Sequence, residues 1–483
     1  MSESDIIKTY NEGINSIVGL VKGLTQTINE LNNKISTLEE RVQSLENQTK
    51  TNSNNSSKPP SSDGLKKKTK SLRKPSGKKP GGQPGHKGCT LKQVENPDEI
   101  IEYIVDKCEK CKASLDDVPV KRYIIRQVID LPEIKVKVTE HRAEVKKCTC
   151  GHINKGNFPE GVTQPIQYGT KIRATSVYLN QYQFIPYDRQ EEFFENLFNH
   201  HISKGTLASI NKTCYDSLES IENNIKEILK NDTGAVHYDE TGVFVDKKLK
   251  WLHVTSNNQF TYYNVHAKRG SEATDEIGIL PEFHGTAVHD SWRSYNKYTK
   301  CDHSLCCAHI LRELNAITEL EKQNWAENMK LLLLEIKSEV DKAFPYANAL
   351  TLDKIVLYEE KYNSIIVSGQ EEDFKLNFDS KTKKVKKSKS KPLLERLSLR
   401  RNEVLRFMTD FDIPFDNNQA ERDIRMTKVK QKVSGTFRSS SGAEFFARIR
   451  GYISTVRKHS KNVIECLEST FTNNPIDPTL TQS

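Results

Sequence analysis

The sequence predicts a multidomain α+β protein in which an N-terminal coiled coil, a small cysteine-bearing β unit and a helical unit precede a larger α+β domain. Three observations predict this organisation. Apolar residues recur in heptads over about the first 50 residues. Two cysteine pairs flank β-type runs between residues 108 and 150. Further along, aspartates end two β-type runs and a glutamate opens a basic helix.

Length and composition limit the class of protein. The chain has 483 residues, a formal net charge of +9 and ten cysteines, and this length predicts several domains. No apolar run approaches the roughly 20 residues that span a bilayer, and the acidic start, residues 1–5, lacks a signal-peptide pattern. We therefore expect a cytoplasmic protein without membrane contact, whose cysteines are thiols or zinc ligands rather than disulfides.

Residues 1–50 are predicted to form a coiled coil. β-Branched residues at the a positions with mostly leucine at d favour a parallel two-stranded assembly. We expect a homodimer or higher oligomer; the alternative is an amphipathic helix folded onto the body of the protein. The side chains expected at the dimer interface include Ile28, Leu31, Ile35, Leu38, Val42 and Leu45.

Residues 51–92 are predicted to be a disordered basic linker. The stretch 58–87 holds ten Lys/Arg against one acid, Asp63, amid Pro, Gly and Ser, and such a segment cannot bury a core. A second run, 381–391, contains seven lysines and reads as a solvated loop or a DNA-contacting one.

Residues 93–160 are predicted to form a zinc-ribbon-like domain. β-Type runs at 123–131 and 134–141 could form a two-stranded ribbon that holds two cysteine pairs together. A structural Zn²⁺ needs four tetrahedral thiolate or imidazole ligands. His152 could replace one cysteine, and ordinary thiols are the alternative. The cysteines of the two pairs are Cys108, Cys111, Cys148 and Cys150.

Residues 161–230 are predicted to form a helical, helix-turn-helix-like unit. A helix at 187–197 is followed by a turn, and Ser203 is a suitable N-cap for the next helix. Lys204 and Lys212 on that second helix are candidate DNA contacts. The alternative is a helical hairpin that serves only packing.

Residues 231–465 are predicted to form an α+β catalytic domain, followed by a C-terminal tail at 466–483. A helix at 271–279 precedes the last strand, and a helical insertion is expected at about 318–400. Several strands, a helix and a further strand, with acids on the first and last strands, form the layout of a ribonuclease-H-like domain. The expected strands are 235–239, 243–246, 251–255, 260–266 and one that ends at Asp290.

Three carboxylates form the candidate catalytic site. Asp239 ends the first strand, Asp290 ends the last, and Glu421 opens a basic helix. Together they would hold two Mg²⁺ ions (or Mn²⁺) about 4 Å apart, which stabilise the attacking and leaving oxygens of an in-line phosphoryl displacement. Each aspartate could instead be a turn residue, and Glu421 stands at capping-box spacing from Asn418. Glu240 alternates to the other strand face and is a weaker candidate.

Basic residues continue from Glu421 along the same helix. Lysine and arginine neutralise DNA phosphates independently of sequence, and a guanidinium can bind a phosphate through two hydrogen bonds. The candidate DNA contacts here are Arg422, Arg425, Lys428 and Lys432.

Cys306 and His309 are about one helical turn apart. They could bind a metal, but two ligands do not make a site, and a packed Cys/His pair is the alternative.

With these motifs in place, the chain resembles the transposases of the insertion sequence 66 family, a branch of the DDE transposases. The resemblance covers nearly the whole chain apart from the basic linker and the insertion. It implies that Asp239, Asp290 and Glu421 are the DDE residues and that the cysteine-bearing unit is a zinc-finger-like region. Accessory proteins of the same element are also implied. The matching segments are 79–88, the cysteine pairs, 237–241, 306–309 and 416–422.

The expected function is that of a DNA transposase of a bacterial insertion sequence, associated with the nucleoid. It would bind element ends and target DNA, use metal-activated water to free a 3′-hydroxyl, and join that hydroxyl to the target. One alternative is a DNA-binding regulator whose catalytic domain is inert. Another is a ribonuclease-H-like nuclease that acts on RNA or structured DNA.

Overall fold

The computed structural model describes the chain in several stretches: residues 3–50, 55, 85, 91–379, 384–385, 388–472 and 474–481. Most of the predicted basic linker and part of the lysine run 381–391 lie outside the described residues. The chain divides into two compact units, which are described separately. The first comprises 1–70, 143–191 and 202–483, and the second comprises 71–142 and 192–201.

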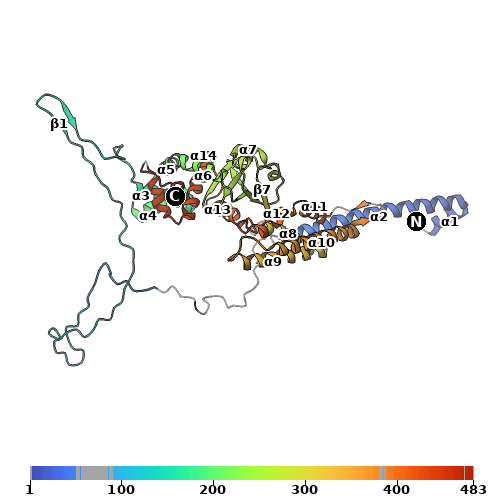
Figure 1. Cartoon of the computed structure of the whole chain (residues 1–483), viewed down its shortest axis with the longest axis horizontal. Coiled ribbons are helices and arrows are strands. Elements are labelled where there is room, and N and C mark those ends of the chain that lie inside the picture. Colours follow the sequence, from blue (N-terminus) through green and yellow to red (C-terminus); the bar gives the residue numbers. More distant parts are fainter. Residues whose placement is uncertain are drawn as a thin grey trace. The chain divides into compact units, whose positions relative to one another are not determined.

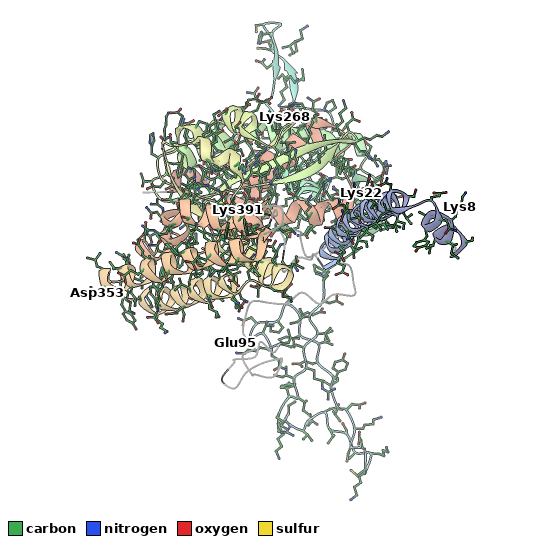
Figure 2. The ribbon with its side chains drawn as sticks, turned by 90° about the vertical axis from the view of Figure 1, so that its right-hand side faces the viewer. Lys8, Lys22, Glu95, Lys268, Asp353 and Lys391 are labelled. Atoms are coloured by element: carbon green, nitrogen blue, oxygen red, sulfur yellow. The ribbon has the colours of Figure 1, made fainter. Side chains whose placement is uncertain are left out.

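Two helices form the N-terminal segment. α1 (Glu3–Asn11) is separated from α2 (Ile14–Lys50) by Gly13, whose φ of 101° only glycine adopts readily. The side chains of α2, Lys22 among them, stand out from the helix (Figure 2). The six side chains expected at the dimer interface are between 52% and 61% exposed in the single chain. α2 therefore carries an apolar stripe along the predicted heptad positions.

The second unit contains little regular structure apart from the end of α4 (Tyr187–Phe198). Its residues 123–131 and 134–141 form no strand among those described, so the predicted two-stranded ribbon is wrong there. Ile124 and Val128 are exposed. Strand propensity expresses packing on a half-buried surface, and these residues have no such surface.

A short hairpin and several helices lie between residues 145 and 230. The predicted helix at 187–197 is confirmed as α4. Ser203 is confirmed as an N-cap, since its Oγ accepts a hydrogen bond from the Thr206 N–H. The elements are hairpin strands β1 (Val145–Lys147) and β2 (Ile153–Lys155), helix α3 (Thr170–Val177), the π-helical turn η2 (Tyr178–Tyr182), α5 (Lys204–Ser217) and α6 (Glu219–Lys230).

A five-stranded mixed sheet forms the centre of the first unit (Figure 1). Its order is β5-β4-β3-β6-β7, in which β3, β4 and β5 are antiparallel and β6 and β7 run parallel to β3. The predicted end of the first strand at Asp239 is wrong, because β3 continues through Gly242, which pairs with Trp251 of β4. The strands are β3 (Ala235–Val245), β4 (Lys248–Ser256), β5 (Thr261–His266), β6 (Thr286–His289) and β7 (Asp302–Leu305).

Helices pack on the sheet and along its edge. One apolar cluster joins Val236 and Tyr238 to α5, α6 and α14 (Ser440–Lys458), and a second joins Val243 to α13 (Asn418–Ser434) and α14. Because side chains alternate along a strand, these clusters lie on opposite faces of β3. α14 passes close to edge strand β5 at Gly451, where a Cβ atom would stand 3.1 Å from the Thr261 carbonyl oxygen.

The predicted helical insertion packs around a hydrophobic core that also includes Leu305 of β7 and residues just before and after the insertion. This core includes Trp325, Met329 and Tyr362, and none of its members comes from strands β3 to β6. α9 and α10 lie side by side (Figure 1). The elements are α8 (Cys307–Ala316), α9 (Asn324–Ala343), α10 (Leu352–Asn377), the short strands β8 (Phe378–Asp379) and β9 (Lys384–Val385), α11 (Ser390–Leu399) and α12 (Arg401–Thr409).

The remaining elements are short. The predicted helix at 271–279 is confirmed as α7, which ends at Gly278 in the left-handed conformation. These elements are α7 (Ser271–Ile277), α15 (Val463–Ser469), the 3-10 turns η3 (Leu280–Glu282), η4 (Arg293–Lys297) and η6 (Pro478–Thr481), and the π-helical turn η5 (Ile317–Glu321).

Candidate active site

Asp239 lies within the central strand β3, and Asp290 directly follows the end of β6, the neighbouring parallel strand. β3 pairs with β6 in a register that sets His237 opposite Val288. Two residues further along each chain stand Asp239 and Asp290. Adjacent strands are about 4.8 Å apart, so the backbone presents the two carboxylates side by side. The Asp239 Oδ1 accepts a hydrogen bond from the Glu240 N–H at 2.8 Å, and the Asp290 Oδ1 accepts one from the Trp292 N–H at 2.9 Å.

Asn417 fixes the start of α13 against β3. Its side chain is 1% exposed. Its Nδ2 donates to the Tyr238 carbonyl at 2.8 Å, and its Oδ1 accepts from His237 Nδ1 at 2.7 Å. The backbone N–H of Asn417 donates to Cys306 Sγ at 3.1 Å. The helix that carries Glu421 is thereby tied to the strand residues that immediately precede Asp239.

Glu421 occupies the first turn of α13 with a side chain that is 17% exposed. Its carboxylate does not close a capping box with Asn418. Instead, Asp416 Oδ1 accepts from the Asn418 N–H at 3.0 Å at the helix start. The Glu421 carboxylate faces α8, with Oε1 3.6 Å from His309 Nδ1 and Oε2 3.8 Å from Arg312 Nη2.

Asp290 and Glu421 both act electrostatically on Asp239. The pKa of Asp239 is raised well above its usual value, first by burial and then by the negative charges of Glu240, Asp290 and Glu421. Burial and neighbouring negative charges make the ionised form of such a carboxyl group unfavourable on its own, and a bound divalent cation would offset these charges. The donor set therefore fits a hard metal ion with oxygen ligands.

Glu240 belongs to the opposite face of β3, as the alternation of side chains predicts. Its carboxylate accepts hydrogen bonds from Arg269 Nε at 2.7 Å and from the Tyr295 hydroxyl at 2.6 Å. The Arg269 guanidinium in turn lies over the rings of Trp251 and Trp292. These contacts satisfy Glu240 within the protein and leave Asp239 as the acid available to a ligand.

Two residues near Glu421 were missed by the sequence reasoning. Asn417 stands beside Glu421 in a segment that the sequence already singled out, and its burial could not be read from one sequence. Arg312 follows His309 by three residues, so both reach the same side of α8. Burial, followed by the positive charge of Arg312, lowers the pKa of His309 and favours its neutral form.

The cysteine pairs sit on two tight turns, one in each unit. The Lys112 N–H donates to the Cys108 carbonyl at 2.9 Å, and the Gly151 N–H donates to the Cys148 carbonyl at 2.8 Å. Hydrogen bonding from the backbone of Cys111 lowers the pKa of Cys108, and hydrogen bonding from the backbone of Cys150 lowers that of Cys148. A lowered thiol pKa favours the thiolate, which is the form that binds zinc.

The lysines and arginines predicted to contact DNA have different surroundings. Arg422, Arg425 and Lys432 are exposed along α13. Lys428 Nζ donates to the Gly242 carbonyl at 2.7 Å. On α5 the two candidates are ion-paired: Lys204 with Asp188 and Glu191, and Lys212 with Asp216.

Three segments of the chain match known protein families. Residues 106–151 match the zinc-finger binding domain of transposase IS66, and residues 9–92 match a family of unknown function (DUF6444). Residues 165–445 match the Transposase IS66 family over more than half of the chain. These matches define a transposase with a zinc-finger domain. The chain belongs to the IS66 transposase family.

Other comparisons add little. No curated protein matches the chain. A chain of the simian T-cell lymphotropic virus intasome, in a cryo-electron microscopy structure with the PP2A regulatory subunit B56 gamma, shares 15% identity. The similarity covers 35% of this chain and 71% of that chain, with a TM-score of 0.14. Within the described residues, no helix is long and apolar enough to cross a membrane.

Proposed function

We propose that this protein is a DNA transposase that cleaves element ends and joins them to target DNA in a ribonuclease-H-like domain. The sheet supports this fold, since three antiparallel strands are followed by two strands parallel to the first. The helical insertion lies between the strand before Asp290 and the helix of Glu421, as expected for a catalytic domain interrupted between its second and third acids.

The observation that supports the proposal is electrostatic: the negative charges of Asp290 and Glu421 both raise the pKa of Asp239. Two strands in fixed register present the aspartates, and Asn417 holds the start of the glutamate helix against one of those strands. Two Mg²⁺ or Mn²⁺ ions bound there would stabilise the attacking and leaving oxygens of the phosphodiester. The protein supplies the three carboxylates at fixed positions.

DNA would be held by exposed cations on α13 and α5. Arg422 and Arg425 follow Glu421 on α13 and can bind backbone phosphates bidentately. Lys432 extends the same exposed helix surface. On α5, Lys204 and Lys212 would have to exchange carboxylate partners for phosphates, so we assign them a smaller share of the binding energy.

The remaining segments would assemble the complex. The apolar stripe of α2 would join two copies, the zinc-finger region would bind one structural Zn²⁺ through its four cysteines, and accessory proteins of the same element would complete the assembly. The match to a zinc-finger binding domain over residues 106–151 supports the second of these statements.

The decisive experiment compares Asp290→Asn with Asp246→Asn. Asp246 is an exposed residue at the turn after β3 with φ of 48°, a conformation that asparagine tolerates. With Mg²⁺ and DNA carrying element ends, we expect Asp290→Asn to retain DNA binding and lose cleavage, and Asp246→Asn to retain both.

Three outcomes would contradict the proposal. If the wild-type protein binds end DNA but never cleaves it, the chain is a DNA-binding regulator. If it cleaves RNA–DNA hybrids in preference to element ends, it is a different nuclease. If Asp290→Asn cleaves as well as the wild type, the three acids are not the catalytic set.

A further inference from the structure

We propose that Cys306, His309 and Glu421 form a transition-metal site, selective for Zn²⁺, that shares its glutamate with the Mg²⁺ site. One ligand atom from each of these residues lies within 4.8 Å of the other two. Among the residues that the structure describes, this is the only such trio of His, Cys, Asp or Glu. The proposal deepens the proposed function, because it concerns control of the same carboxylate.

Two helices bring the three ligands together. Cys306 is the N-cap residue of α8, and the His309 N–H donates to the Cys306 carbonyl at 3.1 Å, so one helical turn presents both side chains. Glu421 comes from the first turn of α13. The Asn417 N–H, at the start of α13, donates to Cys306 Sγ at 3.1 Å and so fixes the two helix starts to each other. The ligands are therefore held before any metal arrives.

Two of the proposed ligand atoms lack a hydrogen-bond partner in the structure. His309 Nδ1 and Glu421 Oε1 are buried and have no hydrogen-bond partner. They face each other at 3.6 Å, beyond ordinary hydrogen-bond length. Two nitrogen or oxygen ligands on a tetrahedral zinc, each about 2.05 Å from the ion, stand about 3.4 Å apart. A bound ion would satisfy both atoms at close to their present separation.

The chemistry of the ligands selects the metal. A thiolate, an imidazole and a carboxylate suit Zn²⁺, whereas Mg²⁺ prefers oxygen ligands alone. Burial raises the pKa of the Cys306 thiol to about 12, and the hydrogen bond from the Asn417 N–H to its Sγ opposes this effect. A bound Zn²⁺ would displace the thiol proton. Arg312 lies beside Oε2 of Glu421 and leaves Oε1 to the metal. Three protein ligands leave the fourth tetrahedral position for water.

Sharing of Glu421 makes the two metals compete. A glutamate bound to zinc beside Cys306 and His309 is withdrawn from the pair of aspartates, so zinc should inhibit Mg²⁺-dependent cleavage and excess Mg²⁺ should relieve the inhibition. The coupling is reciprocal, because each metal lowers the affinity for the other through one side chain.

The first test measures bound zinc in the full-length protein after equilibration with Zn²⁺ and removal of the free ion. We expect the wild type to hold one equivalent more than Cys306→Ser. The matched control is Cys307→Ser, since Cys307 is the buried neighbour whose Sγ faces the Val404 carbonyl and lies outside the trio. His309→Gln provides a second variant that should lose the same equivalent, and a thermal unfolding scan shows that each variant is folded.

The second test adds Zn²⁺ to Mg²⁺-dependent cleavage of element ends. We expect the zinc concentration for half inhibition to rise at least about tenfold in Cys306→Ser and to stay unchanged in Cys307→Ser. Equal zinc content in the wild type, Cys306→Ser and His309→Gln would overturn the zinc site. Absence of cleavage by the wild type in Mg²⁺ alone would instead contradict the proposed function, while the zinc measurement would still decide the present proposal.

Discussion

Asn417 should contribute more to the free energy of unfolding than a polar residue at the start of a helix usually does. The change Asn417→Ala leaves the Tyr238 carbonyl and His237 Nδ1 without their partners in a site where Asn417 is only 1% exposed. Each buried group left unsatisfied costs about 1–3 kcal/mol, so we expect a loss of roughly 2–6 kcal/mol in the free energy of unfolding. This is a large part of the roughly 5–15 kcal/mol that stabilises a typical domain.

The assay is urea unfolding followed by tryptophan fluorescence, to which Trp251 on β4 and Trp292 after Asp290 contribute. The matched control is Asn418→Ala, because Asn418 is exposed and bonds only locally to Asp416. We expect the control to change the unfolding free energy by less than about 0.5 kcal/mol. Displacement of Glu421 by about 1 Å should also slow cleavage on the order of 10²-fold. The reasoning fails if the two variants unfold at the same urea concentration.

Three further predictions address other parts of the chain. Burial lowers the pKa of His253 from 6.5 to about 4. Between pH 7 and pH 5 the His253 side chain therefore binds a proton in the unfolded chain but not in the folded chain, and the free energy of unfolding should fall by about 2 kcal/mol. Urea unfolding of His253→Gln should lack this contribution to the fall. An identical pH dependence of the two proteins would refute the prediction. Leu31→Glu, which places a charge in the apolar stripe of α2, should give monomers by light scattering, whereas Asn33→Glu should not; a dimeric Leu31→Glu would exclude the coiled coil. Cys108→Ser and Cys148→Ser should each remove the same single zinc ion by metal analysis, and full zinc content in either variant would show that the two pairs do not share an ion.

The parts of the site that local patterns define could be predicted from the sequence. Asp290 directly follows β6, as predicted, whereas Asp239 lies within β3 rather than at its end. The parallel register of the two strands pairs His237 with Val288, two residues before each acid. Glu421 opens a helix that begins where its sequence context indicates. The N-cap at Ser203 follows from residue type and position alone. In each case the information lies within a few residues of the feature.

The errors and omissions came from contacts between distant residues. Gly242 reads as a turn, yet it lies within β3 because its neighbour Trp251 continues the antiparallel pairing. Residues 123–131 have strand propensity but no apolar surface against which to pack. Cys306 and His309 formed only two ligands of a possible site, because the third, Glu421, lies more than 100 residues away along the chain. Periodicity within a single sequence does not reveal that residues so far apart along the chain lie close together in space.

The hydrophobic core around α9 and α10 has a practical consequence. Because Trp325, Tyr362 and their neighbours pack among themselves, the end of the insertion between α9 and α10 can be altered without disturbing the carboxylates. Tyr346, in the connection between those helices, is 90% exposed. Exposed connections of this kind accept added sequence most readily. A fluorescent or affinity tag placed there would allow the proposed assembly on DNA to be followed while the sheet and the three acids stay intact.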